Sequence, residues 1–149
     1  MGSIEPAGLP AVRLESLNKL RALKALSDED MVRVQRANLL DPMAPYPSVE
    51  TLLHAFVPHK FVDHTHSTAV LGIVDQPNRR ELCEEIYDGR MGVVRYIMPG
   101  FGLAKEAADV FNIDPKVEGL ILDKHGIFTF GESAKDSYER MIELVTRAE

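Results

Sequence analysis

The first third of the chain has the apolar spacing of helices. Over residues 11–26, six apolar side chains recur mostly at every third position, a pattern typical of an amphipathic helix: Val12, Leu14, Leu17, Leu20, Leu23 and Leu26. Ser27 and the three acidic residues after it predict the cap and first turn of a second helix, which extends to about Leu40. After three prolines, Ser48 is placed to cap a third helix over residues 49–57.

The remainder alternates short apolar runs with further helical patterns. The strand-like runs are residues 60–66, 91–98, 117–123 and 127–130. The helical segments are residues 67–74, 75–88, 103–111 and 133–147. In the last helix, the predicted buried stripe consists of Tyr138, Met141, Ile142 and Val145. Because helices alternate with strands, the predicted fold class is α/β (α+β), with a sheet covered by helices.

Composition narrows the class of protein. A chain of 149 residues with 45% hydrophobic content is long enough for one core and short for two, so we expect one soluble domain over residues 1–149, made of a helical segment (1–46) and a core (47–149). The formal net charge of −6, with dispersed basic residues, argues against nucleic acid, and no apolar run approaches a membrane span. Cys83 is the single cysteine and no secretory leader is evident, so we expect a cytoplasmic protein with a small-molecule partner.

Three of the five histidines fall where metal chemistry is plausible. His64 and His66 end a predicted strand, and side chains two apart on a strand point to the same face, about 6–7 Å apart at the backbone. Their imidazoles can therefore converge on one ion. His125 lies in the turn between two later strands and would supply a third nitrogen through folding. Three nitrogens with one open position are typical of a catalytic rather than a structural metal site.

Other metal sites fit the spacing less well. A cupin-type site wants a glutamate four or five residues after the second histidine, where this chain has Val70 and Leu71. A zincin helix wants histidines at i and i+4, which His54 and His59 do not supply. An exposed His-x-His pair without any ligand role stays open as the alternative.

Two further features have simpler interpretations than catalysis. Gly100-Phe101-Gly102 lies between a strand and a helix, but the third small residue of a dinucleotide motif is replaced by Lys105, so we interpret the glycines as a turn and helix start. Cys83 lies among apolar residues on a helix and is expected to be a core thiol.

A set of short motifs resembles the class II aldolase/adducin family. The motifs are Pro47-Ser48-Val49-Glu50, then Val62-Asp63-His64-Thr65-His66, then Tyr96 ahead of a glycine-containing turn, and finally His125-Gly126, in the order seen in that family. Residues 47–131 are most similar to the aldolase portion of bifunctional rhamnulose-phosphate aldolase/alcohol dehydrogenases. The resemblance implies a three-layer αβα sandwich and a ring-like homotetramer.

The resemblance also implies roles for single residues. The three histidines look like the ligands of Zn²⁺ or another divalent metal. Glu50 looks like the catalytic carboxylate that acts as a base at a ketose phosphate, although by itself it reads as a helix first-turn acid. Tyr96 resembles the proton donor that reaches a neighbouring subunit's site, with a strand-end core aromatic as the alternative. Ser48 resembles a serine that binds the substrate phosphate.

The expected function follows from this set of residues. It is a zinc-dependent lyase that cleaves a ketose 1-phosphate, such as rhamnulose 1-phosphate, to dihydroxyacetone phosphate and an aldehyde through a metal-stabilised enediolate. The chain departs from the family at Val49, where a second serine is usual, and residues 1–46 hold only Gly2 and Gly8 in place of a Gly/Ser-rich phosphate loop, so we expect an N-terminal truncation or another ligand. The alternatives are an adducin-like assembly module without turnover and a metal-dependent sugar-phosphate epimerase or decarboxylase.

Overall fold

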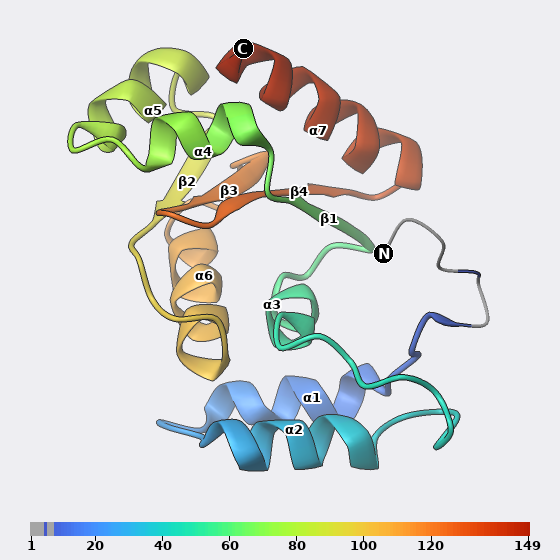
Figure 1. Ribbon diagram of the computed structural model, residues 1–149. Coiled ribbons are helices and arrows are strands. Elements are labelled where there is room, and N and C mark those ends of the chain that lie inside the picture. Colours follow the sequence, from blue (N-terminus) through green and yellow to red (C-terminus); the bar gives the residue numbers. More distant parts are fainter. Residues whose placement is uncertain (1–4, 6–7) are drawn as a thin grey trace. The chain divides into compact units, whose positions relative to one another are not determined.

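The computed structural model describes residue 5 and residues 8–149, so Gly2 lies outside the described part. The chain folds as two compact units, one comprising Met1–Phe56 with Met98–Lys105 and the other Val57–Ile97 with Glu106–Glu149. Helices and a four-stranded mixed sheet make up the described chain, so the predicted α/β class is confirmed (Figure 1).

The first unit is helical, as predicted. Its elements are α1 (Leu14–Lys19), the 3₁₀ turn η2 (Leu20–Ala22), α2 (Asp28–Ala37), α3 (Thr51–Phe56) and the first residues of α6 (Phe101–Ile113). Ser27 caps α2 as predicted, because its side-chain oxygen accepts a hydrogen bond from the backbone N–H of Asp30 at 3.1 Å.

The predicted helix over residues 11–26 is shorter than expected. Apolar residues every third position drift around an α-helix of 3.6 residues per turn, so one straight helix cannot bury all of them. Accordingly, Leu17 is fully buried while Leu14 is 56% exposed. The chain tightens into the 3₁₀ turn, whose repeat of three residues suits the spacing, and Leu23 then leaves it in an extended conformation.

The second unit is built on the sheet. Its strands are β1 (Phe61–Thr65), β2 (Met91–Val94), β3 (Gly119–Leu122) and β4 (Gly126–Gly131), in the order β1-β4-β3-β2. β4 pairs antiparallel with both β1 and β3, whereas β2 and β3 are parallel. The strand predicted over residues 91–98 is shorter than expected, because β2 ends at Val94 and the exposed segment that follows does not pair.

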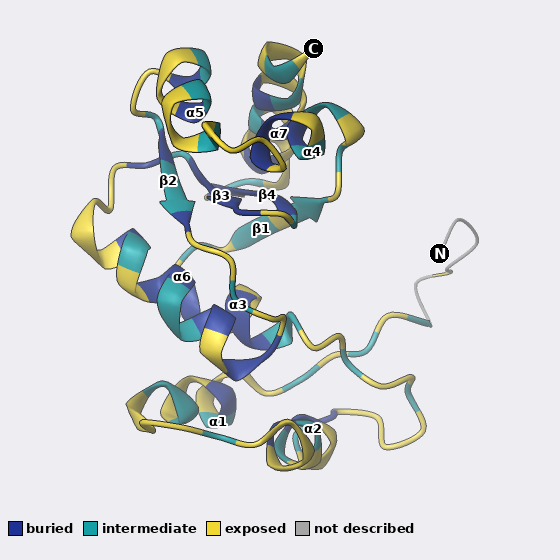
Figure 2. Ribbon diagram, turned by 60° about the vertical axis from the view of Figure 1, so that its left-hand side comes forward, coloured by how far each residue is buried: buried dark blue, intermediate teal, exposed yellow. Residues whose placement is uncertain are grey.

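Helices cover both faces of this sheet. On one face lie α4 (Thr68–Val74), α5 (Arg79–Tyr87) and α7 (Ala134–Ala148), and on the other lies the part of α6 that belongs to this unit (Figure 1). The residues of α4, α5 and α7 that face the sheet are buried, and those that face outward are exposed (Figure 2). The core on this face consists of Val70, Ile73, Val74, Cys83, Tyr87, Met91, Ile121, Ile127, Met141 and Leu144.

The buried stripe of α7 differs from the predicted one. Tyr138 and Ile142 are 62% and 50% exposed, whereas Ser137, Met141 and Leu144 are buried. Met141 is buried as predicted and Val145 packs against the core, whereas Ser137 takes a buried position and exchanges two hydrogen bonds with Thr129 of β4, at 3.0 and 3.3 Å. A stripe drawn through apolar residues alone misses a buried serine whose polar groups are satisfied in this way.

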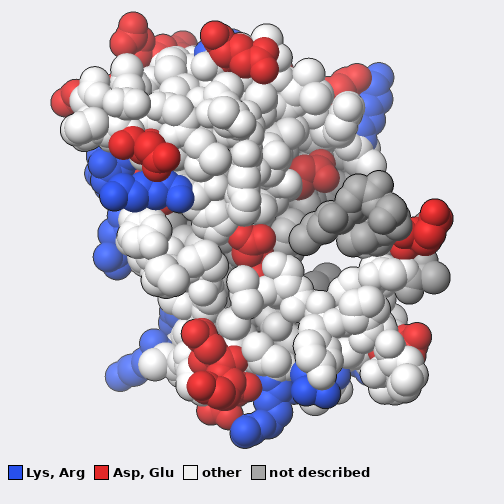
Figure 3. Space-filling view, in the orientation of Figure 1, with Lys and Arg blue, Asp and Glu red and all other residues white. Residues whose placement is uncertain are grey.

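The surface agrees with the dispersed charge of the sequence. On the face shown in Figure 3, blue basic side chains are interspersed with red acidic ones. Among the described residues, no helix has both the length and the apolar character that crossing a bilayer would require.

Candidate metal centre

Two of the three candidate histidines are positioned by the pairing of β1 with β4. His64 lies opposite Phe128 in the register, and its ring stacks on the Phe128 ring with centroids 4.0 Å apart. Directly paired residues share a face of the sheet, so Phe128 forms the floor under the His64 ring. His66 follows directly after the last residue of β1, and its ring centroid lies 4.7 Å from that of His64. The spacing of two along the chain therefore brings the imidazoles together, as predicted.

The third histidine comes from the turn between β3 and β4, also as predicted. The backbone N–H of His125 donates to the carbonyl of Leu122 at 3.1 Å, which closes the turn. Gly126 follows with φ +153°, and a Cβ at this position would lie 2.4 Å from the carbonyl oxygen of Thr65. Only glycine fits so close to the β1 backbone, so the turn can approach the end of β1 and bring the His125 ring to the paired rings.

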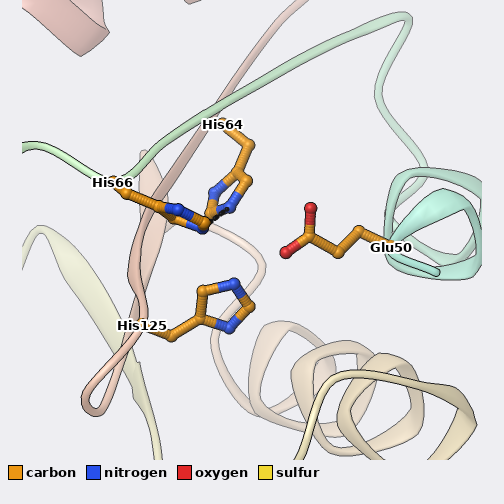
Figure 4. Close-up of side chains that lie close together, drawn as sticks. All are labelled: Glu50, His64, His66 and His125. Carbon is orange, nitrogen blue, oxygen red and sulfur yellow. Dashed lines mark hydrogen bonds between the residues drawn. The ribbon is translucent and has the colours of Figure 1, made fainter. Parts of the chain in front are cut away.

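The three rings face one another (Figure 4). The His125 ring centroid lies 5.2 Å from that of His64 and 4.9 Å from that of His66. Each residue offers a ring nitrogen, and these nitrogens lie within 4.8 Å of one another. The sequence prediction that two remote segments meet at one point in this unit is therefore confirmed.

The protonation of His64 is fixed by its backbone contact. Its Nδ1 lies 2.9 Å from the carbonyl oxygen of Ile127, and since a carbonyl only accepts, Nδ1 carries the hydrogen. Nε2 is then the lone-pair atom of the neutral ring, and it lies 2.9 Å from Nε2 of His66. A backbone carbonyl is one of the groups that commonly orient a metal-binding histidine through its second ring nitrogen.

The donor set fits a divalent metal. Zinc bonds to imidazole nitrogen at about 2.0–2.1 Å in tetrahedral geometry, so two such nitrogens stand about 3.3 Å apart. The Nε2–Nε2 distance of 2.9 Å is a few tenths of an ångström shorter, which small ring movements can supply. Three neutral imidazoles leave the full charge on the ion and one position for an oxygen ligand. His64, His66 and His125 are therefore able to hold a divalent metal.

Ser48 and Glu50 belong to the first unit. The Ser48 hydroxyl oxygen accepts a hydrogen bond from the backbone N–H of Glu50 at 3.2 Å, and the Glu50 carbonyl accepts from Leu53 and His54 at the start of α3. The sequence predicted that Ser48 caps a helix over residues 49–57, but α3 begins at Thr51, so Ser48 closes the turn that precedes the helix. Figure 4 draws the Glu50 side chain with the three histidines. The roles of Ser48 and Glu50 at a substrate remain predictions.

Tyr96 lies in the segment after β2 and does not belong to the core. Its side chain is 49% exposed, so the alternative of a strand-end core aromatic is wrong. The ammonium of Lys124, which directly precedes His125, lies 6.0 Å from the Tyr96 ring centroid. Tyr96 is therefore placed beside the turn that carries His125, and its role as a proton donor remains a prediction.

Phe128 and Lys124 were missed at the sequence level. If residues 61–65 had been paired antiparallel with residues 127–131, the register would have placed Phe128 opposite His64. No comparable signal marks Lys124, because a lysine in a turn ordinarily reads as a solvated charge.

Cys83 is not a candidate nucleophile. It is buried at 3% exposure, and burial raises the pKa of its thiol from 9.0 to about 11. Burial also raises the pKa of Tyr87, one helical turn further on, to about 12. Both groups are therefore neutral near pH 7, and the prediction of a core thiol is confirmed.

Solved structures of other proteins are similar in fold to this chain. A structure of the N-terminal class II aldolase domain of a conserved protein from Thermoplasma acidophilum aligns with 99% of this chain and 68% of its own, at 38% identity and a TM-score of 0.91. A sugar-phosphate aldolase from Thermotoga maritima aligns with 74% of this chain and 55% of its own, at 20% identity and a TM-score of 0.62. The second likeness concerns the fold alone.

Comparison with known sequences gives the family. The curated protein named "Uncharacterized oxidoreductase YuxG" from Bacillus subtilis is 34% identical over all 149 residues. This chain spans only 22% of the length of that relative. Residues 20–149 match the family described as Class II Aldolase and Adducin N-terminal domain, which confirms the resemblance drawn from the motifs. The chain belongs to the class II aldolase and adducin family.

Proposed function

We propose that this chain is a metal-dependent lyase domain that cleaves a ketose 1-phosphate, such as rhamnulose 1-phosphate, to dihydroxyacetone phosphate and an aldehyde. The single observation that carries the proposal is the meeting of three imidazoles around one point, with the His64 tautomer fixed by the Ile127 carbonyl. Membership of the class II aldolase and adducin family supports the same chemistry. Zinc is the metal that this nitrogen set favours in our proposal.

The protein side chains would divide the work as follows. His64, His66 and His125 hold the metal, which when bound supplies Lewis-acid stabilisation of the negative charge that develops on the substrate oxygens. Glu50 accepts the proton of the hydroxyl group on the carbon that becomes the aldehyde. The carbon–carbon bond breaks, and its electron pair passes to the ketone half of the substrate.

Protonation and phosphate binding complete the proposed cycle. Tyr96, reaching the site of a neighbouring subunit in a homotetramer, supplies the proton that the cleaved half takes up. Its exposed side chain, beside Lys124, supports this role over a structural one. Ser48 binds the phosphate, and its hydroxyl hydrogen can point to a ligand because its oxygen already accepts the Glu50 N–H.

The names of the relatives guide the choice of substrates without deciding it. The Thermotoga maritima structure is titled a sugar-phosphate aldolase, and the Bacillus subtilis relative is named an oxidoreductase. An aldolase portion joined to a dehydrogenase in a longer cytoplasmic enzyme would agree with both names, and we include that arrangement in the proposal.

The decisive experiment measures aldehyde release from ketose 1-phosphates, with rhamnulose 1-phosphate first. We expect turnover with zinc, loss of turnover with a chelator and loss in His64→Ala. Asp63→Ala is the matched control, because Asp63 is the exposed neighbour on the same strand and points to the opposite face. Metal binding without any aldehyde release by the full-length natural protein would remove the lyase proposal.

A second candidate is supported by the first unit. Helices α1 and α2 occupy the part of the sequence in which aldolase relatives are expected to carry a phosphate loop, and Gly8 is its only described glycine. In this case the chain would bind metal and assemble without turnover, as in adducin. The same assay separates the candidates, and an isomerised sugar phosphate instead of an aldehyde would indicate an epimerase.

A further inference from the structure

A buried ion pair stands directly before the turn that carries His125. Asp123 follows the last residue of β3 and is 2% exposed. Its Oδ2 lies 2.8 Å from Nε of Arg79, the first residue of α5. The Arg79 side chain is 29% exposed. Neither residue was singled out by the sequence, in which the two are separated by 44 positions (123 − 79).

The carboxylate of Asp123 is on the opposite face of the sheet from the histidines. The register pairs Thr65 with Ile127 and Ile127 with Ile121, and both isoleucines belong to the core under α4, α5 and α7. Asp123 comes two residues after Ile121 and continues that face. His64 pairs with Phe128 on the other face. Asp123 can therefore act on the metal centre only through the backbone of the turn.

The backbone of Asp123 ties this turn to the neighbouring strand. Its N–H donates to the carbonyl of Val94, the last residue of β2, at 2.9 Å. One residue later, Lys124 has φ +56°, a left-handed conformation that costs an ordinary side chain about 1 kcal/mol or more. His125 follows at once. The side chain and the backbone of residue 123 thus fix where a strained turn begins.

Burying the charges of this ion pair costs free energy of desolvation that apolar side chains would avoid. Replacing a buried ion pair by apolar side chains is often neutral or stabilising, so stability alone is a weak reason to keep one. Among the described residues, moreover, neither Oδ1 of Asp123 nor Nε of Arg79 has a hydrogen-bond partner, so the pair is an ionic contact without hydrogen-bond geometry. An incompletely satisfied carboxylate and a left-handed lysine occur in succession, immediately before a candidate ligand. Local costs of this kind accumulate where the surrounding structure serves a site.

We propose that Asp123, held by Arg79, is a positioning residue that sets the turn conformation in which the His125 ring reaches His64 and His66. This inference rests on the proposed metal centre. It assigns Arg79 and Asp123 no contact with substrate or metal.

The test compares two arginines, each of which pairs with an acidic residue next to one end of β3. Arg79→Gln and Asp123→Asn remove the pair before the turn. Arg90→Gln removes the pair at the other end of β3, where Arg90 binds Glu118 and Glu143 and is 25% exposed, close to the exposure of Arg79. We expect Arg79→Gln and Asp123→Asn to weaken the Kd for zinc about ten- to a hundredfold, as supporting contacts of metal ligands do, and Arg90→Gln to leave it within about twofold. Arg79→Lys, which keeps the charge, is expected to restore most of the affinity.

A second readout does not need the metal. Amide hydrogen exchange of the metal-free protein reports on the His125 N–H, which is bonded to Leu122. We expect faster exchange at residues 123–126 in Arg79→Gln and unchanged exchange there in Arg90→Gln. If both variants lost similar thermal stability while zinc affinity and turn exchange stayed at the natural values, Asp123 would be structural only. If the natural protein bound no zinc, the metal centre would fail, and the exchange comparison would still decide whether the pair fixes the turn.

Discussion

The two ends of the β3–β4 hairpin are built differently. At its open end, Arg90 forms partly buried ion pairs with Glu118 and Glu143, and neither Gly119 nor Gly131 has a positive φ. At its turn end, a carboxylate is buried, Lys124 is left-handed and Gly126 lies against the β1 backbone. Both ends belong to the same pair of strands, so pairing alone does not explain the difference. The turn end presents a histidine, and it does so at a conformational cost that the open end avoids.

The largest expected effect is on metal affinity at the turn end. His64→Ala removes a ligand, and we expect stoichiometric zinc binding to be lost, by more than about a hundredfold in Kd, since even supporting residues of a ligand carry ten- to a hundredfold. The domain should stay folded because the core under α4, α5 and α7 lies on the other face of the sheet and keeps all its side chains. Metal analysis and circular dichroism of the same sample check both parts. Retained zinc would count against this ligand set.

The next effect compares a glycine from each end. Gly126→Ala places a Cβ 2.4 Å from the Thr65 carbonyl oxygen at a positive φ, and we expect a loss of about 3 kcal/mol in unfolding free energy together with weaker zinc binding. Gly131→Ala places a Cβ 2.6 Å from the Ser137 amide nitrogen and is expected to lower stability without changing zinc affinity per folded molecule. Denaturant titration and zinc titration of both variants provide the measurement. Equal loss of affinity in the two would erase the distinction between the ends.

A pH effect follows from the buried thiol. Burial and the charge of Asp123 raise the pKa of Cys83 from 9.0 to about 11, so the unfolded chain releases this proton first. Stability is therefore unaffected below pH 9 and falls between pH 9 and 11, by up to about 2–3 kcal/mol for a shift of this size. Cys83→Ala should flatten this part of the profile relative to the natural protein. A profile that is equally steep in Cys83→Ala would assign the loss to other groups, of which Tyr87 is the first to examine.

The smallest expected effect is a gain in stability. Lys124→Gly relieves the left-handed conformation at φ +56° and is expected to stabilise the protein by about 1 kcal/mol. Thermal unfolding checks this change, and Lys135→Gly, in the first turn of α7, is the contrasting control that should destabilise. If the gain comes with faster exchange at His125, the strain at this residue serves the turn.

The sequence predicted what local pattern and spacing determine. The histidine pair and the turn histidine were identified because a strand period of two and a hairpin turn are short-range features. The buried stripe of α7 was predicted only in part: Met141 and Val145 contribute to the core, but Ser137 is buried by hydrogen bonds to Thr129 that no apolar pattern reveals. The Arg79–Asp123 pair was invisible for a similar reason. An aspartate after a strand reads as a turn residue until the fold shows a partner 44 positions away (123 − 79).

The pairing of β1 with β4 also determines whether folding or metal binding comes first. Two imidazoles are synthesised some sixty residues before the third, and they meet it only after the antiparallel ladder has closed. An ion cannot gather such distant donors in an unfolded chain without bearing the entropy of closing that long loop. In the metal centre that we propose, folding therefore precedes metal loading, because the three donors are brought together only in the folded unit.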